Sequence, residues 1–136
     1  MDFMKSIAIA ASGLRAQAGR MRVLSENIAN ADSTAQAPGQ DPYRRRIPTF
    51  VSQLDRALEA RTVALGPVRT DPSDFISKYQ PGHPAADAAG YVKFPNVNSL
   101  VEVTDMREAQ RSYEANVNVI SATRRMIQRT LDILRA

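Results

Sequence analysis

The sequence MREAQRSYEANVNVISATRRMIQRTLDIL, residues 106–134, decides the fold of this chain. Positions at alternating intervals of four and three residues are mostly apolar, and they are Met106, Gln110, Tyr113, Val117, Ile120, Arg124, Ile127, Leu131 and Leu134. A mean spacing of about 3.5 residues is typical of the seam of a coiled coil rather than the wider stripe of a globular helix. Asn98 or Ser99 can cap the start, and Ser99 with Glu102 has the spacing of a capping box. The pattern predicts one helix from about residue 99 to residue 134.

The first thirty residues repeat this spacing. Their seam consists of Phe3, Ile7, Ala10, Leu14, Gln17, Met21, Leu24 and Ile28, in which Gln17 is the one polar interruption. Gly13 and Gly19 lower the intrinsic helicity by roughly 1 kcal/mol each relative to alanine. We therefore expect a helix that is marginal alone and buries its seam against the C-terminal helix or against other chains.

All eight prolines lie between Pro38 and Pro95, which separates two helical ends from an irregular middle. Short β-compatible stretches lie between turn signals in this middle, at 47–51, 62–69, 75–79 and 91–94, and residues 53–60 are predicted to form a helical turn. We expect a mainly α fold whose terminal helices pair as a coiled coil around a small β-rich segment. The predicted divisions are residues 1–33, 34–96 and 97–136.

The composition excludes several classes of protein. Among 136 residues there is no cysteine, so disulfides and thiolate chemistry are impossible, and the net charge of +4 is modest. The longest apolar run, residues 7–11, is far shorter than the roughly 20 residues that span a bilayer. Asp2 disrupts a signal-like N-terminus and the helical pattern continues through Ile28, so we expect these residues to be mature structure without a cleaved signal peptide.

Side chains with catalytic or metal-binding chemistry are scarce. His83 is the only histidine and lies in the turn-like sequence Pro81-Gly82-His83-Pro84, which favours a turn residue over a ligand or a base. Asp71 and Asp74 flank a turn and are interpreted as loop caps. We expect no enzyme activity, no cofactor and no metal. The basic run 44–46 is interpreted as a solvated surface, because the chain shows neither a groove-reading element nor the stacking aromatic side chains of a nucleic-acid binder.

Three motifs carry a resemblance to a known family. The run Ser25-Glu26-Asn27-Ile28-Ala29-Asn30-Ala31-Asp32 resembles the asparagine-rich motif of flagellar rod, hook and hook-associated proteins. The segments 79–87 and 90–97 are similar to the middle of FlgC-type rod subunits, and residues 106–116 resemble the C-terminal motif of the same axial family. The residues expected to carry the family motif are Asn27, Asn30, Pro81, Gly82, His83, Pro84, Gly90, Tyr91, Pro95, Asn96, Tyr113, Glu114 and Asn116.

The resemblance implies a torque-transmitting subunit of the proximal rod, which crosses the periplasm within the basal body. Its implied partners are other proximal and distal rod subunits, further copies of itself, the membrane-ring adaptor and the flagellar type III export apparatus. The terminal helices would line the export channel as an inner layer. The subunit-interface seam is then expected at Ile7, Leu14, Met21, Leu24, Ile28, Met106, Tyr113, Val117, Ile120, Ile127, Leu131 and Leu134.

Two alternatives remain open. One is another rod or hook subunit of the same family, although hook-type relatives usually carry larger middle domains. The other is a cytoplasmic coiled-coil adaptor or secretion chaperone that uses the same heptads to bind its partners.

Overall fold

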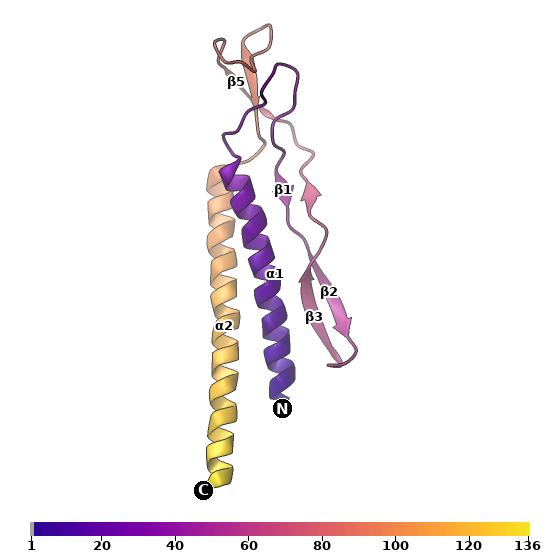
Figure 1. The fold of residues 1–136 in the computed structure, drawn as a ribbon, viewed down its shortest axis with the longest axis vertical. Helices are drawn as coiled ribbons and strands as arrows, with labels where there is room; N and C mark the ends of the chain where they lie inside the picture. The colour runs from indigo at the N-terminus through magenta and orange to yellow at the C-terminus, as the bar shows by residue number, and fades with distance from the viewer. Residues whose placement is uncertain (1) are drawn as a thin grey trace. The chain divides into compact units, whose positions relative to one another are not determined.

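The structure is a computed structural model that describes residues 2–136. The chain has two helices, α1 (Phe3–Ala29) and α2 (Ser99–Arg135), and six short strands lie between them in sequence (Figure 1). The strands are β1 (Arg46–Ile47), β2 (Phe50–Asp55), β3 (Ala60–Leu65), β4 (Arg69–Thr70), β5 (Ile76–Tyr79) and β6 (Tyr91–Phe94). The predicted fold class, two paired terminal helices with a small β-rich middle, is confirmed.

The strands form three separate antiparallel pairs, β1 with β4, β2 with β3, and β5 with β6. The helical turn predicted at 53–60 is wrong, because Gln53 pairs with Thr62 and Asp55 pairs with Ala60 in the β2–β3 ladder. The Asp55 carboxylate accepts hydrogen bonds from the backbone of the turn, and Glu59 takes a left-handed conformation with φ of 47°. A hairpin turn therefore replaces the expected helical one.

Polar side chains set the helix ends. The Asp2 carboxylate accepts from the Met4 and Lys5 amides at 3.1 Å each, which caps α1. At the start of α2, Asn98 Oδ1 accepts from Leu100 N at 3.1 Å and lies 3.4 Å from Val101 N. Of the two caps that the sequence allowed, the structure therefore uses Asn98.

The chain forms two compact units. The first unit comprises Met1–Met21, Thr49–Pro67 and Arg107–Ala136, and the second comprises Arg22–Pro48 and Val68–Met106. Each helix contributes to both units.

The first unit is held by close approaches to the part of α1 that belongs to it, up to Met21. A Cβ atom added at Gly13 would lie 2.8 Å from Asn116 Nδ2 on α2, and one added at Gly19 would lie 2.9 Å from Leu65 Cδ2 on β3. The Val63 amide of β3 donates to Ser12 Oγ at 3.2 Å. Within this unit α1 therefore lies between α2 and the β2–β3 hairpin (Figure 1).

The second unit has a small apolar core. Val92 and Phe94 of β6 are buried with Ala85, and Ala35 and Ala86 pack against them. Val23, Leu24 and Val97 are also buried in this unit, and fully buried polar side chains accompany them.

Candidate functional site

A buried cluster of polar side chains lies in the second unit, where the last turns of α1 approach the first turn of α2. We call it the polar junction, and it consists of Asn27, Arg45, Asp71, Asn96 and Glu102. Asn27 and Glu102 are both 0% exposed. Buried polar groups are costly unless they are hydrogen-bonded, so the partners of each one decide what the cluster does.

Asn27 makes four hydrogen bonds through its side-chain amide. Its Nδ2 donates to the Arg46 carbonyl at 2.7 Å and to Glu102 Oε2 at 2.9 Å. Its Oδ1 accepts from the Tyr43 hydroxyl at 2.8 Å and from the Arg46 amide at 2.9 Å. A primary amide has two donor hydrogens and two acceptor lone pairs, so the capacity of Asn27 is filled. The same amide joins both helices to the start of β1.

The Glu102 carboxylate is the charged centre of the junction. Its Oε1 accepts from Arg45 Nε, and its Oε2 accepts from Asn27. Arg45 also forms an ion pair with Asp71 Oδ2 at 3.3 Å. The glutamate that the sequence assigned to a capping box with Ser99 is therefore a buried ion-pair partner. That assignment is corrected because its carboxylate is occupied elsewhere.

The ionisation of two junction groups follows from these contacts. Partial burial opposes the charge on Arg45, but the hydrogen bonds and charges of Glu102 and Asp71 outweigh it, so the Arg45 pKa lies above its ordinary value. Hydrogen bonds from the Ser73 backbone and hydroxyl, aided by Arg45, lower the pKa of Asp71. The loop-capping interpretation of Asp71 is confirmed by its bond from the Ser73 amide at 2.9 Å.

The basic run 44–46 is not a solvated surface, and that interpretation is wrong for two of its three members. Arg44 donates to the Asp71 and Ser73 carbonyls at 3.0 and 2.8 Å, and its guanidinium lies 4.1 Å from the centre of the Phe75 ring. Arg45 belongs to the junction, and only Arg46 is exposed. The charges of Arg44 and Arg45 are therefore used within the fold.

Asn96 closes the junction from the side of α2. Its Oδ1 accepts from the Arg45 amide at 2.8 Å, and its Nδ2 donates to the Asp71 and Ser73 carbonyls at 3.2 and 3.1 Å. Pro95 beside it is fully buried. Four segments distant in sequence, around residues 27, 45, 71 and 96–102, are thereby fixed to one another.

The other motif residues have local roles. Asn30 Nδ2 donates to the Glu26 carbonyl at 2.8 Å, and because this carbonyl also accepts from the Asn30 amide at 3.1 Å, the side chain reinforces the end of α1. His83 Nδ1 accepts from the Ala85 amide at 3.0 Å, so the expected turn role of this histidine is confirmed. Gly90 has a φ of 86° just before β6, which is a conformation that favours glycine. Pro81, Gly82 and Pro84 are exposed in the preceding turn, as is Glu114 on α2.

The predicted interface residues fall into two groups. Leu24 is buried, and most of the others are half-buried, namely Ile7, Leu14, Met21, Ile28, Met106, Tyr113, Ile120 and Ile127. By contrast, Val117, Leu131 and Leu134 are 39%, 44% and 77% exposed. These three apolar side chains follow the coiled-coil period but have little cover within the described chain.

In the first unit, the side of α2 that faces the rest of the unit shares only every second residue with the predicted seam. Tyr113, Ile120 and Ile127 belong to both, but the intervening buried positions are Ala109, Asn116 and Thr123 rather than 110, 117 and 124. Ala109 is 0% exposed and Thr123 is 3% exposed. Asn116 is the residue against which Gly13 packs, so small and polar side chains line the close approach.

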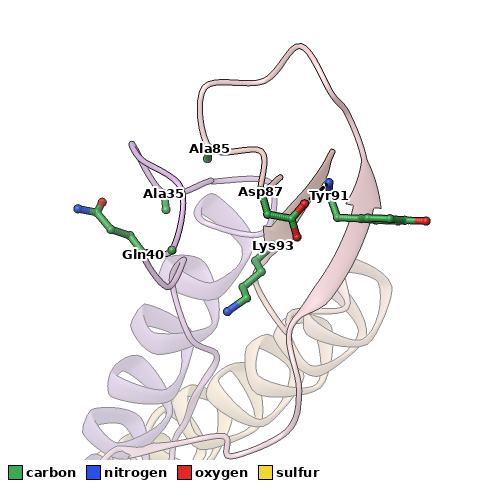
Figure 2. A pocket seen from close by; sticks show the side chains of 7 residues that line it. Ala35, Gln40, Ala85, Asp87, Tyr91 and Lys93 are labelled. Atoms are coloured by element: carbon green, nitrogen blue, oxygen red, sulfur yellow. Dashed lines mark hydrogen bonds between the residues drawn. The ribbon is translucent and has the colours of Figure 1, made fainter. Parts of the chain in front are cut away.

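A pocket of about 240 Å³ lies in the second unit beside the loop that follows α1. Figure 2 shows the Tyr91 ring and the Gln40 side chain pointing away from it, and the Asp87 carboxylate beside the Tyr91 backbone nitrogen. That carboxylate already accepts from the Ala89 and Tyr91 amides at 2.9 Å each. The volume is below the roughly 300 Å³ at which ligand pockets usually begin. The pocket gives no ground for a cofactor site.

Two further findings concern residues 2–136 as a whole. No cluster of three potential metal-ligating side chains occurs in this range. Neither helix within it is long and apolar enough to cross a bilayer.

The comparisons with known proteins agree with the motifs. Residues 7–36 match the family described as flagella basal body rod protein, and residues 88–133 match the C-terminal region of the flagellar basal body rod FlgEFG proteins. A flagellar basal-body rod protein FlgC of Agrobacterium fabrum is 52% identical, with 94% of this chain and 92% of that protein covered. The FlgC proteins of Bacillus subtilis and Salmonella typhimurium are each 38% identical over 98% of this chain and 99% and 98% of their own lengths.

These proteins define a class, the axial rod proteins of the flagellar basal body. Within that class, this chain belongs to the flagellar basal-body rod protein FlgC family. The resemblance inferred from the three motifs is thereby confirmed.

Sequence reasoning missed most of the polar junction. Asn27 and Asn96 were found as motif residues, but Arg45 and Glu102 were assigned to a solvated surface and a helix cap. One signal could have pointed to them. A basic run and a lone glutamate at the start of a long helix are complementary charges.

Proposed function

We propose that this chain is a structural subunit of the flagellar proximal rod, which polymerises through its terminal helices, and that it is not an enzyme. Membership of the FlgC family supports the assignment to the rod. In this proposal the polar junction fixes the ends of α1 and α2 as one rigid piece, and the helix faces outside it make the contacts between subunits. Torque then passes through side chains that no single subunit buries alone.

The observation that carries the proposal is the exposure of seam residues in the single chain. Val117, Leu131 and Leu134 continue the 3.5-residue period, yet 39%, 44% and 77% of their surfaces remain exposed. Figure 1 shows the C-terminal end of α2 continuing past the N-terminal end of α1 in the first unit. Burial of one large apolar side chain is worth roughly 1.5 to 3 kcal/mol. Other chains are the natural cover for these positions.

The geometry of assembly follows from the same surface. Contacts between different faces of identical or similar subunits generate open helical arrays when the rotation does not close. We propose that the interface residues are the predicted seam positions, from Ile7 to Leu134, that keep exposed surface in the single chain, which leaves out the buried Leu24. The three-part division at residues 33 and 96 then separates inner helices from the outer middle segment. The partners would be further copies, other proximal and distal rod subunits, and the membrane-ring adaptor.

The proposed location is the rod where it crosses the periplasm, reached through the flagellar type III apparatus. The signal-like residues near the N-terminus lie within α1, and Ala10 among them is buried in the folded first unit. That packing supports a role for these residues in the working subunit rather than in a cleaved leader. The alternative of a cytoplasmic adaptor predicts that the protein stays with soluble complexes and is absent from basal bodies.

The test uses two glutamate substitutions on α2. Leu134→Glu alters an exposed seam position, and Gln128→Glu alters an exposed position about 120° away around the helix at 100° per residue. Leu134 is largely exposed and Gln128 makes only an exposed hydrogen bond to Asp132 Oδ1 at 3.1 Å, so both variants should have circular dichroism and urea midpoints close to those of the wild type. We expect Leu134→Glu to be depleted from purified basal bodies and to impair swimming, while Gln128→Glu assembles normally.

Absence of the wild-type chain from basal bodies would refute the rod assignment. Normal incorporation of both variants would refute the seam as the interface while leaving the rod assignment in place.

A further inference from the structure

A second apolar surface lies on α2 in the first unit, apart from the proposed seam. We call it the outer stripe, and it consists of Ala115, Val119, Ala122, Met126 and Ile133. Val119, Met126 and Ile133 recur every seven residues and are 47%, 43% and 75% exposed. Val119 directly precedes Ile120 in sequence, so the stripe lies about 100° around the helix from the buried side.

Basic side chains border the outer stripe along one edge. Arg107, Arg111, Arg125 and Arg129 are spaced by four, fourteen and four residues, which brings all of them within about 40° of one line on an α-helix at 100° per residue. All four are exposed. None of them lies within ion-pair distance of a carboxylate in residues 2–136, where the described ion pairs involve other cations. We call this set the arginine row.

The charge of the two units is unequal. The first unit has eleven basic and six acidic side chains, an excess of five positive charges, whereas the second has seven basic and eight acidic. α1 carries four basic residues and one acidic residue. Another copy of this chain would therefore bring a further basic helix to the arginine row, and like charges at a helix interface oppose association.

An apolar stripe with a charged edge is the pattern by which coiled-coil helices choose their partners. The apolar positions supply affinity, and the flanking charges select a helix with opposite charges along its own edge. A row of arginines without partners thus specifies glutamate or aspartate on the facing helix. Neither helix of this chain meets that description in the first unit.

We propose that the outer stripe and arginine row dock an amphipathic helix with an acidic edge, supplied by a chain of different sequence. This inference deepens the proposed function and rests on it, because it assigns one face of the subunit to an unlike neighbour. Copies of this chain would then meet through the seam, and an unlike subunit through the outer stripe. The two faces would give the assembly an order of subunits.

The binding test uses the full chain and two synthetic amphipathic helices of equal length. The peptides share one apolar face and differ only in carrying glutamate or lysine along its edge. We expect the acidic-edged peptide to bind at least roughly tenfold more tightly, because several exposed ion pairs of ordinary strength multiply to about that factor. The preference should weaken as salt is raised, since exposed charges are screened.

A charge-reversal variant identifies the face. Arg125→Glu with Arg129→Glu should reverse the preference toward the lysine peptide. The matched control is Arg56→Glu with Arg61→Glu, which makes the same change in net charge at exposed positions on the β2–β3 hairpin and its turn and should keep the preference. Equal binding of the two peptides, no binding of either, or an unchanged preference in the α2 variant would overturn the proposal. Salt-sensitive self-association through the arginine row would overturn it in favour of a second copy.

The same variants separate this inference from the rod assignment in cells. If the wild-type chain is found in basal bodies and the α2 double variant is incorporated as well as its control, the rod assignment holds and the acidic-partner proposal fails. If the α2 variant alone is lost from basal bodies, with an unchanged urea midpoint, both stand.

Discussion

Replacing Asn27 by leucine should destabilise the second unit strongly, although the two side chains are similar in size. The leucine side chain is close in volume but removes all four hydrogen bonds of the amide. It leaves one oxygen of the buried Glu102 carboxylate, the backbone groups of Arg46 and the Tyr43 hydroxyl without that partner. Loss of the bond to a charged group costs about 1.5 to 3 kcal/mol, and each neutral buried group left unpaired costs about 1 to 3 kcal/mol.

At the lower limits these four losses come to about 4.5 kcal/mol, so we expect a total loss of about 5 kcal/mol, the upper end of the range for breaking a buried charged pair. Small domains are stable by only about 5 to 15 kcal/mol, so the second unit should be partly unfolded at 25 °C. The assay is urea unfolding followed by circular dichroism, with amide exchange to locate the loss at residues 22–48 and 68–106. Asn27→Asp should be comparably harmful, because it sets a second carboxylate at the 2.9 Å contact with Glu102.

The control is Asn30→Leu, which removes one bond to the Glu26 carbonyl and should cost about 0.5 to 1.5 kcal/mol. If Asn27→Leu shifted the urea midpoint no more than Asn30→Leu, the polar junction would not be what orders the second unit.

Three further outcomes are expected. Ala109→Asp should lower the free energy of unfolding of the first unit by several kcal/mol, because it buries an unpaired carboxylate. As a control, Gln110→Asp at an exposed position should change that free energy by less than about 0.5 kcal/mol. Equal urea midpoints of the two variants would contradict the observed packing of α2. Asp71 has a pKa below its ordinary 3.8, so its ionised carboxylate stabilises the fold above that pH, and this stabilisation is lost as the pH falls through the depressed value. The urea midpoint of Asp71→Asn should therefore lie below that of the wild type at neutral pH and converge with it in acid. A difference between the two midpoints that does not change with pH would refute this. Gln17→Leu should raise the melting temperature, because the buried Gln17 Oε1 has no hydrogen-bond partner within the described residues, and a fall would show that this oxygen is satisfied.

The sequence was a good guide to the helices for a physical reason. Helical periodicity and proline positions are local properties, so the predicted ends near residues 28, 99 and 134 lie within one residue of those observed. The strands were harder, because Gln53, Leu54 and Asp55 become a strand only through pairing with β3. No local signal separates that outcome from a short helical turn.

The polar junction also lay beyond local reasoning. Arginines 44–46 are identical in type and adjacent, yet one stacks on Phe75, one pairs with Glu102 and Asp71, and one is exposed. Their environments depend on segments 19 to 57 residues away in the chain. A run of like charges therefore did not indicate a surface here.

The sequence by itself determined that two long helices of coiled-coil period flank a proline-rich middle, and that the motifs are those of a rod protein. It also determined one column of α2 at Met106, Tyr113, Ile120 and Ile127. The sequence could not decide whether the second column follows the first by three residues, beginning at Ala109, or by four residues, beginning at Gln110. The tertiary structure chose Ala109, Asn116 and Thr123, and a Cβ atom at Gly13 would lie 2.8 Å from Asn116 Nδ2, so the helices are too close there for a larger side chain. The larger Val117 remains outside it because steric fit, rather than hydrophobicity, decides which residues face α1 at this close approach.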